Sequence, residues 1–152
     1  MRMYKKALIV TIILSLAMPT LGLKAQIKSP KQLVAEAKVS INWVTPQQAA
    51  KMMKTIPNLI VIDVRQGGEY QLGHIPGAIN IPRGLLEFRI THVTKDPNRP
   101  ILVYCLTGGR ATLAVKALEK MGYKKIYNLK GGFKAWKKAG LPVSRKPCDM
   151  AG

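Results

Sequence analysis

The feature of this sequence that most constrains its fold is an apolar run that ends at a cysteine and passes into a helical pattern. The run Ile101–Tyr104 is continuously apolar, which is typical of a strand covered on both faces. From Arg110 to Met121, apolar residues recur at three- and four-residue spacing, as on one face of a helix. Cys105 is therefore predicted to lie where a buried strand ends, on a short loop that leads into a helix N-terminus.

This loop has the composition of an anion site beside a sulfur nucleophile. Gly108 and Gly109 have no Cβ, so the backbone there can turn its N–H groups inward. The first N–H groups of a helix are unpaired and its dipole is positive, which stabilises a thiolate at Cys105. Arg110 adds a permanent positive charge with two-pronged geometry. A buried structural cysteine followed by an ordinary glycine turn is the alternative interpretation. The expected substrate contacts are Leu106, Thr107, Gly108, Gly109 and Arg110.

The rest of the chain alternates between strand and helix patterns. Strands are predicted at residues 42–44, 59–63, 78–81, 101–104 and 125–128. Helices are predicted at residues 29–40, 46–54, 69–72, 110–121 and after residue 132, and a helix is predicted to start at residues 83–88. Residues 90–99 are polar and turn-rich, with a loop at residues 96–98. Such alternation with short connections predicts one α/β domain, in which helices cover both faces of a parallel sheet of about five strands.

A second group of polar residues follows the apolar run at residues 59–63. Ligands of doubly wound sheets gather at the carboxyl ends of strands, so Asp63 and Arg65 are expected on the same edge as the cysteine loop. Arg65 can act as a second anion contact, but an ion pair with Asp63 or Glu69 that shapes the loop is favoured. His74 lies in a Gly/Pro turn, where a structural role is favoured over that of a general base.

Several segments resemble the rhodanese family of sulfurtransferases, in one order from about Val44 to Val143. Tyr104–Ala111 resembles the active-site loop of that family. The other matching segments are Asp63–Arg65, Glu69–Tyr70, Gly73–Pro82, Gly122–Tyr123, Tyr127–Gly132, Ala135–Trp136 and Ala139–Pro142. The resemblance implies a three-layer rhodanese-like domain. It also implies that Cys105 takes a sulfur from a small anionic donor such as thiosulfate, carries it as a persulfide, and passes it to cyanide or a thiol.

The length of the loop separates this pattern from related chemistry. Phosphatases and arsenate reductases that share the fold of the rhodanese family use Cys-x5-Arg. In this chain Cys105 and Arg110 are spaced as Cys-x4-Arg, which is the loop length of the sulfurtransferases. Leu106 and Thr107 are less charged than the residues that many family members have there, so an organic or protein-bound persulfide is a plausible donor besides thiosulfate. Two alternatives stay open: a non-catalytic sulfur carrier or binding module, and a thiol redox protein that uses Cys105 and Cys148.

The spacing of the two cysteines and two histidines offers no metal site, and the resemblance implies no cofactor. In an oxidising compartment an even number of cysteines suggests a disulfide. A stable Cys105–Cys148 bond is disfavoured here because Cys148 lies in a loose, Pro-containing tail.

Residues 1–25 have the layout of a secretory signal peptide, with a basic start, an apolar run from Ala7 to Met18 and a cleavage site near residue 25. The run falls short of the ~20 residues that a spanning helix needs, which favours cleavage over a retained anchor. Export is therefore expected, most simply to a bacterial periplasm, without stable membrane insertion. The predicted division is a signal peptide at 1–25, a helical extension at 26–43, the rhodanese domain at 44–145 and a tail at 146–152.

The formal net charge of +18 favours anionic partners. The lysines are scattered along the chain, and no basic motif is interleaved with aromatic residues as in RNA-binding domains. A solvated basic surface is favoured over a dedicated patch, and no nucleic-acid partner is predicted.

Overall fold

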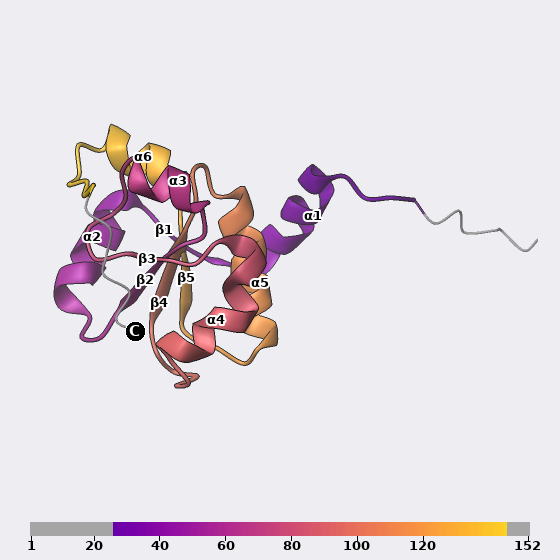
Figure 1. Cartoon of the computed structure of the whole chain (residues 1–152). Coiled ribbons are helices and arrows are strands. Elements are labelled where there is room, and N and C mark those ends of the chain that lie inside the picture. Colours follow the sequence, from indigo (N-terminus) through magenta and orange to yellow (C-terminus); the bar gives the residue numbers. More distant parts are fainter. Residues whose placement is uncertain (1–25, 146–152) are drawn as a thin grey trace, which may run out of the picture.

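The computed structural model describes residues 26–145 (Figure 1). The predicted signal peptide and the tail with Cys148 lie outside the described residues. Signal cleavage and export therefore remain predictions, as does the expectation that Cys105 and Cys148 form no stable disulfide. Within the described part of the chain, no helix is long and apolar enough to cross a membrane.

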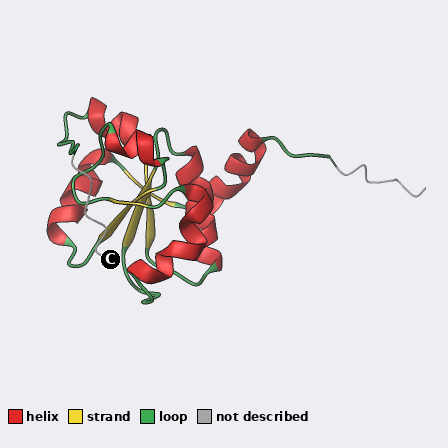
Figure 2. Cartoon of the chain, viewed as in Figure 1, coloured by secondary structure: helices red, strands yellow, loops and turns green. Residues whose placement is uncertain are grey.

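The strands form one parallel sheet in the order β1-β5-β4-β2-β3, with β4 at its centre (Figure 2). The strands are β1 (Asn42–Val44), β2 (Ile60–Asp63), β3 (Ile79–Asn80), β4 (Ile101–Tyr104) and β5 (Ile126–Leu129). Each strand lies within one or two residues of its predicted position. The structure thus confirms the prediction of an α/β domain built on a five-stranded parallel sheet.

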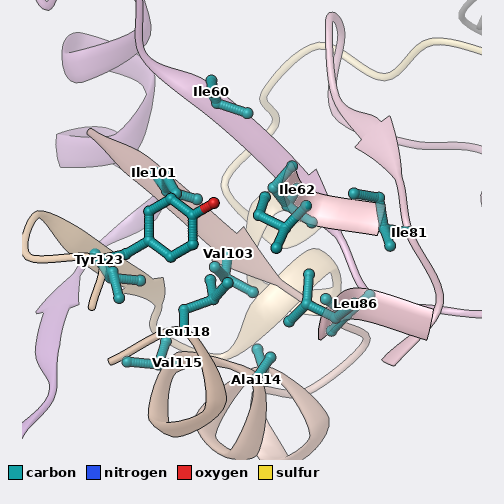
Figure 3. Packing of buried hydrophobic residues seen from close by; sticks show 14 of the residues in the cluster. Ile60, Ile62, Ile81, Leu86, Ile101, Val103, Ala114, Val115, Leu118 and Tyr123 are labelled. Atoms are coloured by element: carbon teal, nitrogen blue, oxygen red, sulfur yellow. The ribbon is translucent and has the colours of Figure 1, made fainter. Parts of the chain in front are cut away.

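The residues of β2 and β4 alternate between two hydrophobic clusters, one on each face of the sheet. One face is covered by α2 (Pro46–Thr55), α3 (Gly67–Gln71) and α6 (Gly132–Lys138). The other is covered by α4 (Leu86–Val93), which follows the short helix η2 (Arg83–Leu85), and by α5 (Gly109–Lys120). Figure 3 shows the second cluster, in which Leu86 and Leu118 point toward Val103 of the central strand. Burial on both faces explains why these strands read as continuous apolar runs.

The helix that was predicted to start at residues 83–88 continues into a segment that the sequence showed as polar and turn-rich. α4 ends at Val93, and the predicted loop at residues 96–98 lies beyond it. Leu86 and Ile90 lie one helical turn apart and are both fully buried in the second hydrophobic cluster. Their packing on the inner face stabilises the helix, and polar side chains on the outer face do not oppose it.

A helical extension precedes the first strand and packs against α5 (Figure 1). It consists of α1 (Pro30–Ala37) and the short helix η1 (Lys38–Ser40). The Ser29 hydroxyl accepts the backbone N–H of Gln32, and the Gln32 side chain accepts the N–H of Ser29, so the helix start is capped on both sides. Ala37 is buried, and Lys116 of α5 donates a hydrogen bond to Ser40.

Candidate active site

Cys105 follows the last residue of β4, and α5 begins at Gly109. This is the predicted strand–loop–helix arrangement. The side chain of Cys105 is buried inside the domain, since the residue is only 1% exposed. The sulfur accepts a hydrogen bond from the backbone N–H of Gly108, at 3.1 Å. Gly108 has φ of 109°, a left-handed conformation that side chains rarely adopt, and this turn directs its N–H to the sulfur.

The loop backbone is held from outside by the first residues of α6. The Phe133 N–H donates to the carbonyl of Cys105 at 2.8 Å, and the Lys134 N–H donates to the carbonyl of Leu106 at 3.0 Å. Gly132 makes this approach feasible, because a Cβ there would lie 2.5 Å from the Cys105 oxygen. The sequence analysis did not assign this role to Gly132. Its signal in the sequence was the adjacent pair Gly131–Gly132.

Arg110 lies beside the sulfur and is held by Glu69 of α3. Its two terminal nitrogens donate to the two carboxylate oxygens of Glu69 at 2.7 and 2.8 Å. This hydrogen bonding raises the pKa of Arg110, and the charge of Cys105 contributes in the same direction. Arg110 can therefore stabilise negative charge at Cys105 while Glu69 fixes its orientation. The sequence analysis named Glu69 only as a partner of Arg65. A pairing across 41 positions has no local signal.

The hydrogen bonds from Arg110 lower the pKa of Glu69 from the ordinary 4.5 to about 2. A carboxyl with a depressed pKa in the folded state stabilises the fold fully above its unfolded pKa, and that contribution is lost as the pH falls from about 4.5 toward 2. We therefore expect an NMR titration of the Glu69 carboxyl carbon to have its midpoint near 2. In Arg110→Gln the midpoint should return toward 4.5.

Arg83→Gln is the matched control for this titration, because it removes an arginine from a different ion pair, that with Glu87. It should leave the midpoint of Glu69 where it is in the wild type. A wild-type midpoint near 4.5 would show that the Glu69–Arg110 pair does not hold in solution.

Arg65 and Asp63 form the buried ion pair that the sequence analysis favoured. The Arg65 terminal nitrogen lies 2.6 Å from an Asp63 oxygen, with the two side chains 3% and 0% exposed. The same nitrogen donates to the carbonyl of Gly73 at 2.7 Å, and the guanidinium lies 4.2 Å from the centroid of the Phe133 ring. Phe133 is the residue whose N–H holds the Cys105 carbonyl. Through Phe133, the Asp63–Arg65 pair thus supports the cysteine loop. Arg65 makes its hydrogen bonds to other groups of the protein.

His74 is buried, and its side chain contacts Tyr70. Its ring stacks on Tyr70, with centroids 3.7 Å apart, and Nδ1 donates to the Tyr70 carbonyl at 3.0 Å. Leu106 and Thr107, by contrast, are exposed at the loop surface. Within residues 26–145, no three His, Cys, Asp or Glu side chains gather as a metal site would need.

The domain is thus a parallel α/β fold with a buried cysteine just after its central strand, where the sulfur accepts a backbone N–H and an arginine lies beside it. This is the arrangement of the α/β proteins that use a cysteine as nucleophile. The sequence profile of the rhodanese-like domain matches residues 45–139, and this chain belongs to that family.

Similar proteins agree with the family and with sulfur transfer in general. The chain is 30% identical to a sulfurtransferase of Allochromatium vinosum, over 68% of this chain and 94% of the relative. It is 32% identical to the thiosulfate sulfurtransferase GlpE of Ectopseudomonas mendocina, over 62% of this chain and 83% of the relative. The solution structure of a homodimeric polysulfide-sulfur transferase from Wolinella succinogenes superposes with a TM-score of 0.65 at 33% identity, covering 80% of this chain and 89% of that one. The match to two proteins of Bacillus subtilis spans a smaller share of those relatives, 59% and 42% of their lengths.

Proposed function

We propose that this chain is a sulfurtransferase that moves a sulfane sulfur from thiosulfate or another persulfide donor to cyanide or a thiol, through a persulfide on Cys105. The observation that carries the proposal is the hydrogen bond of 3.1 Å from the Gly108 N–H to the sulfur of Cys105, with Arg110 beside it. These groups provide positive potential where a thiolate or a persulfide anion needs it.

In the first half-reaction, the Cys105 thiolate attacks the outer sulfur of thiosulfate. A bond forms between the two sulfurs, the bond inside thiosulfate breaks, and sulfite leaves with its electron pair. In the second half-reaction, cyanide attacks the outer sulfur of the persulfide. Thiocyanate leaves, and the electron pair returns to Cys105 as a thiolate. The burial of Cys105 fits an intermediate that must be kept from water and oxidants.

Two features bear on the donor. Arg110 already makes two hydrogen bonds to Glu69, so part of its capacity to bind the oxygens of thiosulfate is used within the protein. Leu106 at the loop surface is apolar and 40% exposed. These features favour an organic persulfide as a donor beside thiosulfate, whereas the named activity of the GlpE relative favours thiosulfate itself.

The test of this function is the intact mass of the reduced full chain after incubation with thiosulfate. We expect a gain of one sulfur atom, which cyanide removes again with release of an equal amount of thiocyanate. The same gain is expected in Cys148→Ser, because the proposed mechanism uses one cysteine. A gain that cyanide removes in one stoichiometric step, without continued thiocyanate release when thiosulfate is in excess, would indicate a sulfur carrier. Loss of activity in Cys148→Ser would instead favour the thiol redox alternative.

A further inference from the structure

A pocket of about 600 Å³ lies against the cysteine loop, on the side where the N-terminal extension packs. It is lined by Val34, Lys38, Trp43, Thr107, Gly108, Gly109, Lys130 and Gly131. Val34, Lys38 and Trp43 all precede residue 45, where the match to the family begins. The extension, seen beside α5 in Figure 1, therefore supplies one wall of the pocket and the cysteine loop supplies another.

The extension and β1 lie so close to the loop backbone that a side chain on the loop glycines would touch them. A Cβ at Gly108 would lie 3.9 Å from the Trp43 ring, and a Cβ at Gly109 would lie 3.9 Å from a methyl group of Val34. Gly108 is also the residue whose N–H donates to the sulfur of Cys105. The same glycine thus borders both the pocket and the nucleophile, and exposed Thr107 forms the rim between them.

The pocket combines positive charge with apolar surface. Lys38 and Lys130 are exposed, and among residues 26–145 neither has an ion-pair partner. No carboxylate is among the lining residues, so the charge of the two lysines is uncompensated there. The Trp43 ring and Val34 offer apolar contact beside them. Such a wall suits an organic molecule that has an aliphatic or peptide body and negatively charged ends.

We propose that this pocket binds the body of a small organic thiol that carries carboxylate groups, and that this thiol accepts the sulfur held on Cys105. The inference rests on the proposed sulfurtransferase function. Pockets that hold small organic ligands have volumes of roughly 300–1,000 Å³, which includes this one. Thiosulfate and cyanide are far smaller and need no such space. The carboxylates pair with Lys38 and Lys130, and the thiol reaches Cys105 across Thr107.

The transfer step balances without an oxidant or a reductant. The thiol sulfur attacks the outer sulfur of the Cys105 persulfide, and a new sulfur–sulfur bond forms. The bond between the outer sulfur and Cys105 breaks, and its electron pair returns to Cys105 as a thiolate. The proton of the thiol ends on the new organic persulfide.

The pocket itself is tested by calorimetry of the full chain with S-methylglutathione, a tripeptide thioether that has two carboxylates and no free thiol. We expect binding that weakens about tenfold in Lys38→Glu and in Lys130→Glu, because each change replaces an attraction by a repulsion. Lys51→Glu is the matched control: this exposed lysine lies on α2, outside the lining of the pocket. Absence of binding, or equal weakening in the control, overturns the proposal.

The acceptor role is tested on protein that has been loaded with sulfur and then mixed with glutathione or with cysteamine, a thiol without a carboxylate. We expect the ratio of the two transfer rates to fall about tenfold from wild type to Lys38→Glu and to stay constant in Lys51→Glu. The wild-type preference should also weaken as salt is added. A ratio that does not differ between Lys38→Glu and the control overturns the acceptor role. Failure of the wild type to take up sulfur contradicts the proposed function, while the calorimetry still decides whether the pocket binds the thioether.

Discussion

The Cys105→Ser variant is expected to lose sulfur uptake from thiosulfate by at least about 10³-fold while it keeps its fold. Serine has nearly the same shape, and its oxygen can still accept the hydrogen bond from Gly108 that holds the sulfur in the wild type. The change in the free energy of unfolding should therefore stay within about 1–2 kcal/mol. A hydroxyl has no neighbouring general base in this loop and cannot form a persulfide, so the nucleophile is lost outright.

The measurement combines intact mass after incubation with thiosulfate and thiocyanate release in a steady-state assay. Urea unfolding of the same preparation shows whether the domain is intact. Cys148→Ser is the matched control, since it removes the chain's other thiol from a tail outside the described residues. Sulfur uptake in Cys105→Ser equal to that of the wild type would remove Cys105 from the reaction altogether.

The Gly132→Ala variant is expected to damage both the stability of the domain and the geometry of the cysteine loop. The new Cβ would lie 2.5 Å from the carbonyl oxygen of Cys105 and 2.8 Å from the carbonyl carbon and oxygen of Leu106. These are backbone atoms, so no flexible side chain can relieve the contact. Gly132 also has φ of 59°, which adds backbone strain. We expect a loss of about 2–5 kcal/mol in the free energy of unfolding.

Activity should fall further than stability alone explains, because the clash pushes the loop away from α6. A displacement of about 1 Å at a reacting group can cost roughly 10²-fold in rate, and we expect sulfur uptake to slow by that order. Gly140→Ala separates the two effects. Gly140 has a similar φ of 68°, but a Cβ there meets nothing within 4 Å, so only the strain of about 1–2 kcal/mol remains. Equal rates for the two folded variants would show that the contact of Gly132 with the loop does not set its geometry.

The strands and most helices of this domain could be predicted from the sequence because their sequence signals are local. The continuous apolar character of residues 59–63 and 101–104 reflects strands buried on both faces, and it predicted the sheet and the end of β4 at the cysteine. The start of α2 was equally local, since Thr45 caps it and Pro46 occupies its first position. The end of α4 had no such local signal, because it depends on packing against residues far away in the chain.

The parts of the candidate site that the sequence did not predict are contacts between distant segments. Arg110 pairs with Glu69 across 41 positions, and α6 donates hydrogen bonds to carbonyl groups of residues 105 and 106. Neither contact produces a periodic or spaced pattern. The pocket was even harder to predict from the sequence, because it exists only where the extension, the end of β5 and the loop meet.

Because α6 holds the cysteine loop, the order in which the chain is synthesised limits when the site can form. Cys105 is synthesised before β5, the strand that enters the sheet between β1 and β4. It is also synthesised before Phe133 and Lys134, whose N–H groups hold the carbonyls of the loop. A growing chain that has just passed Cys105 therefore carries the thiol without the later segments that bury it and hold its loop. The contacts of the loop are complete only when the last helix of the described residues has been made and packs against it.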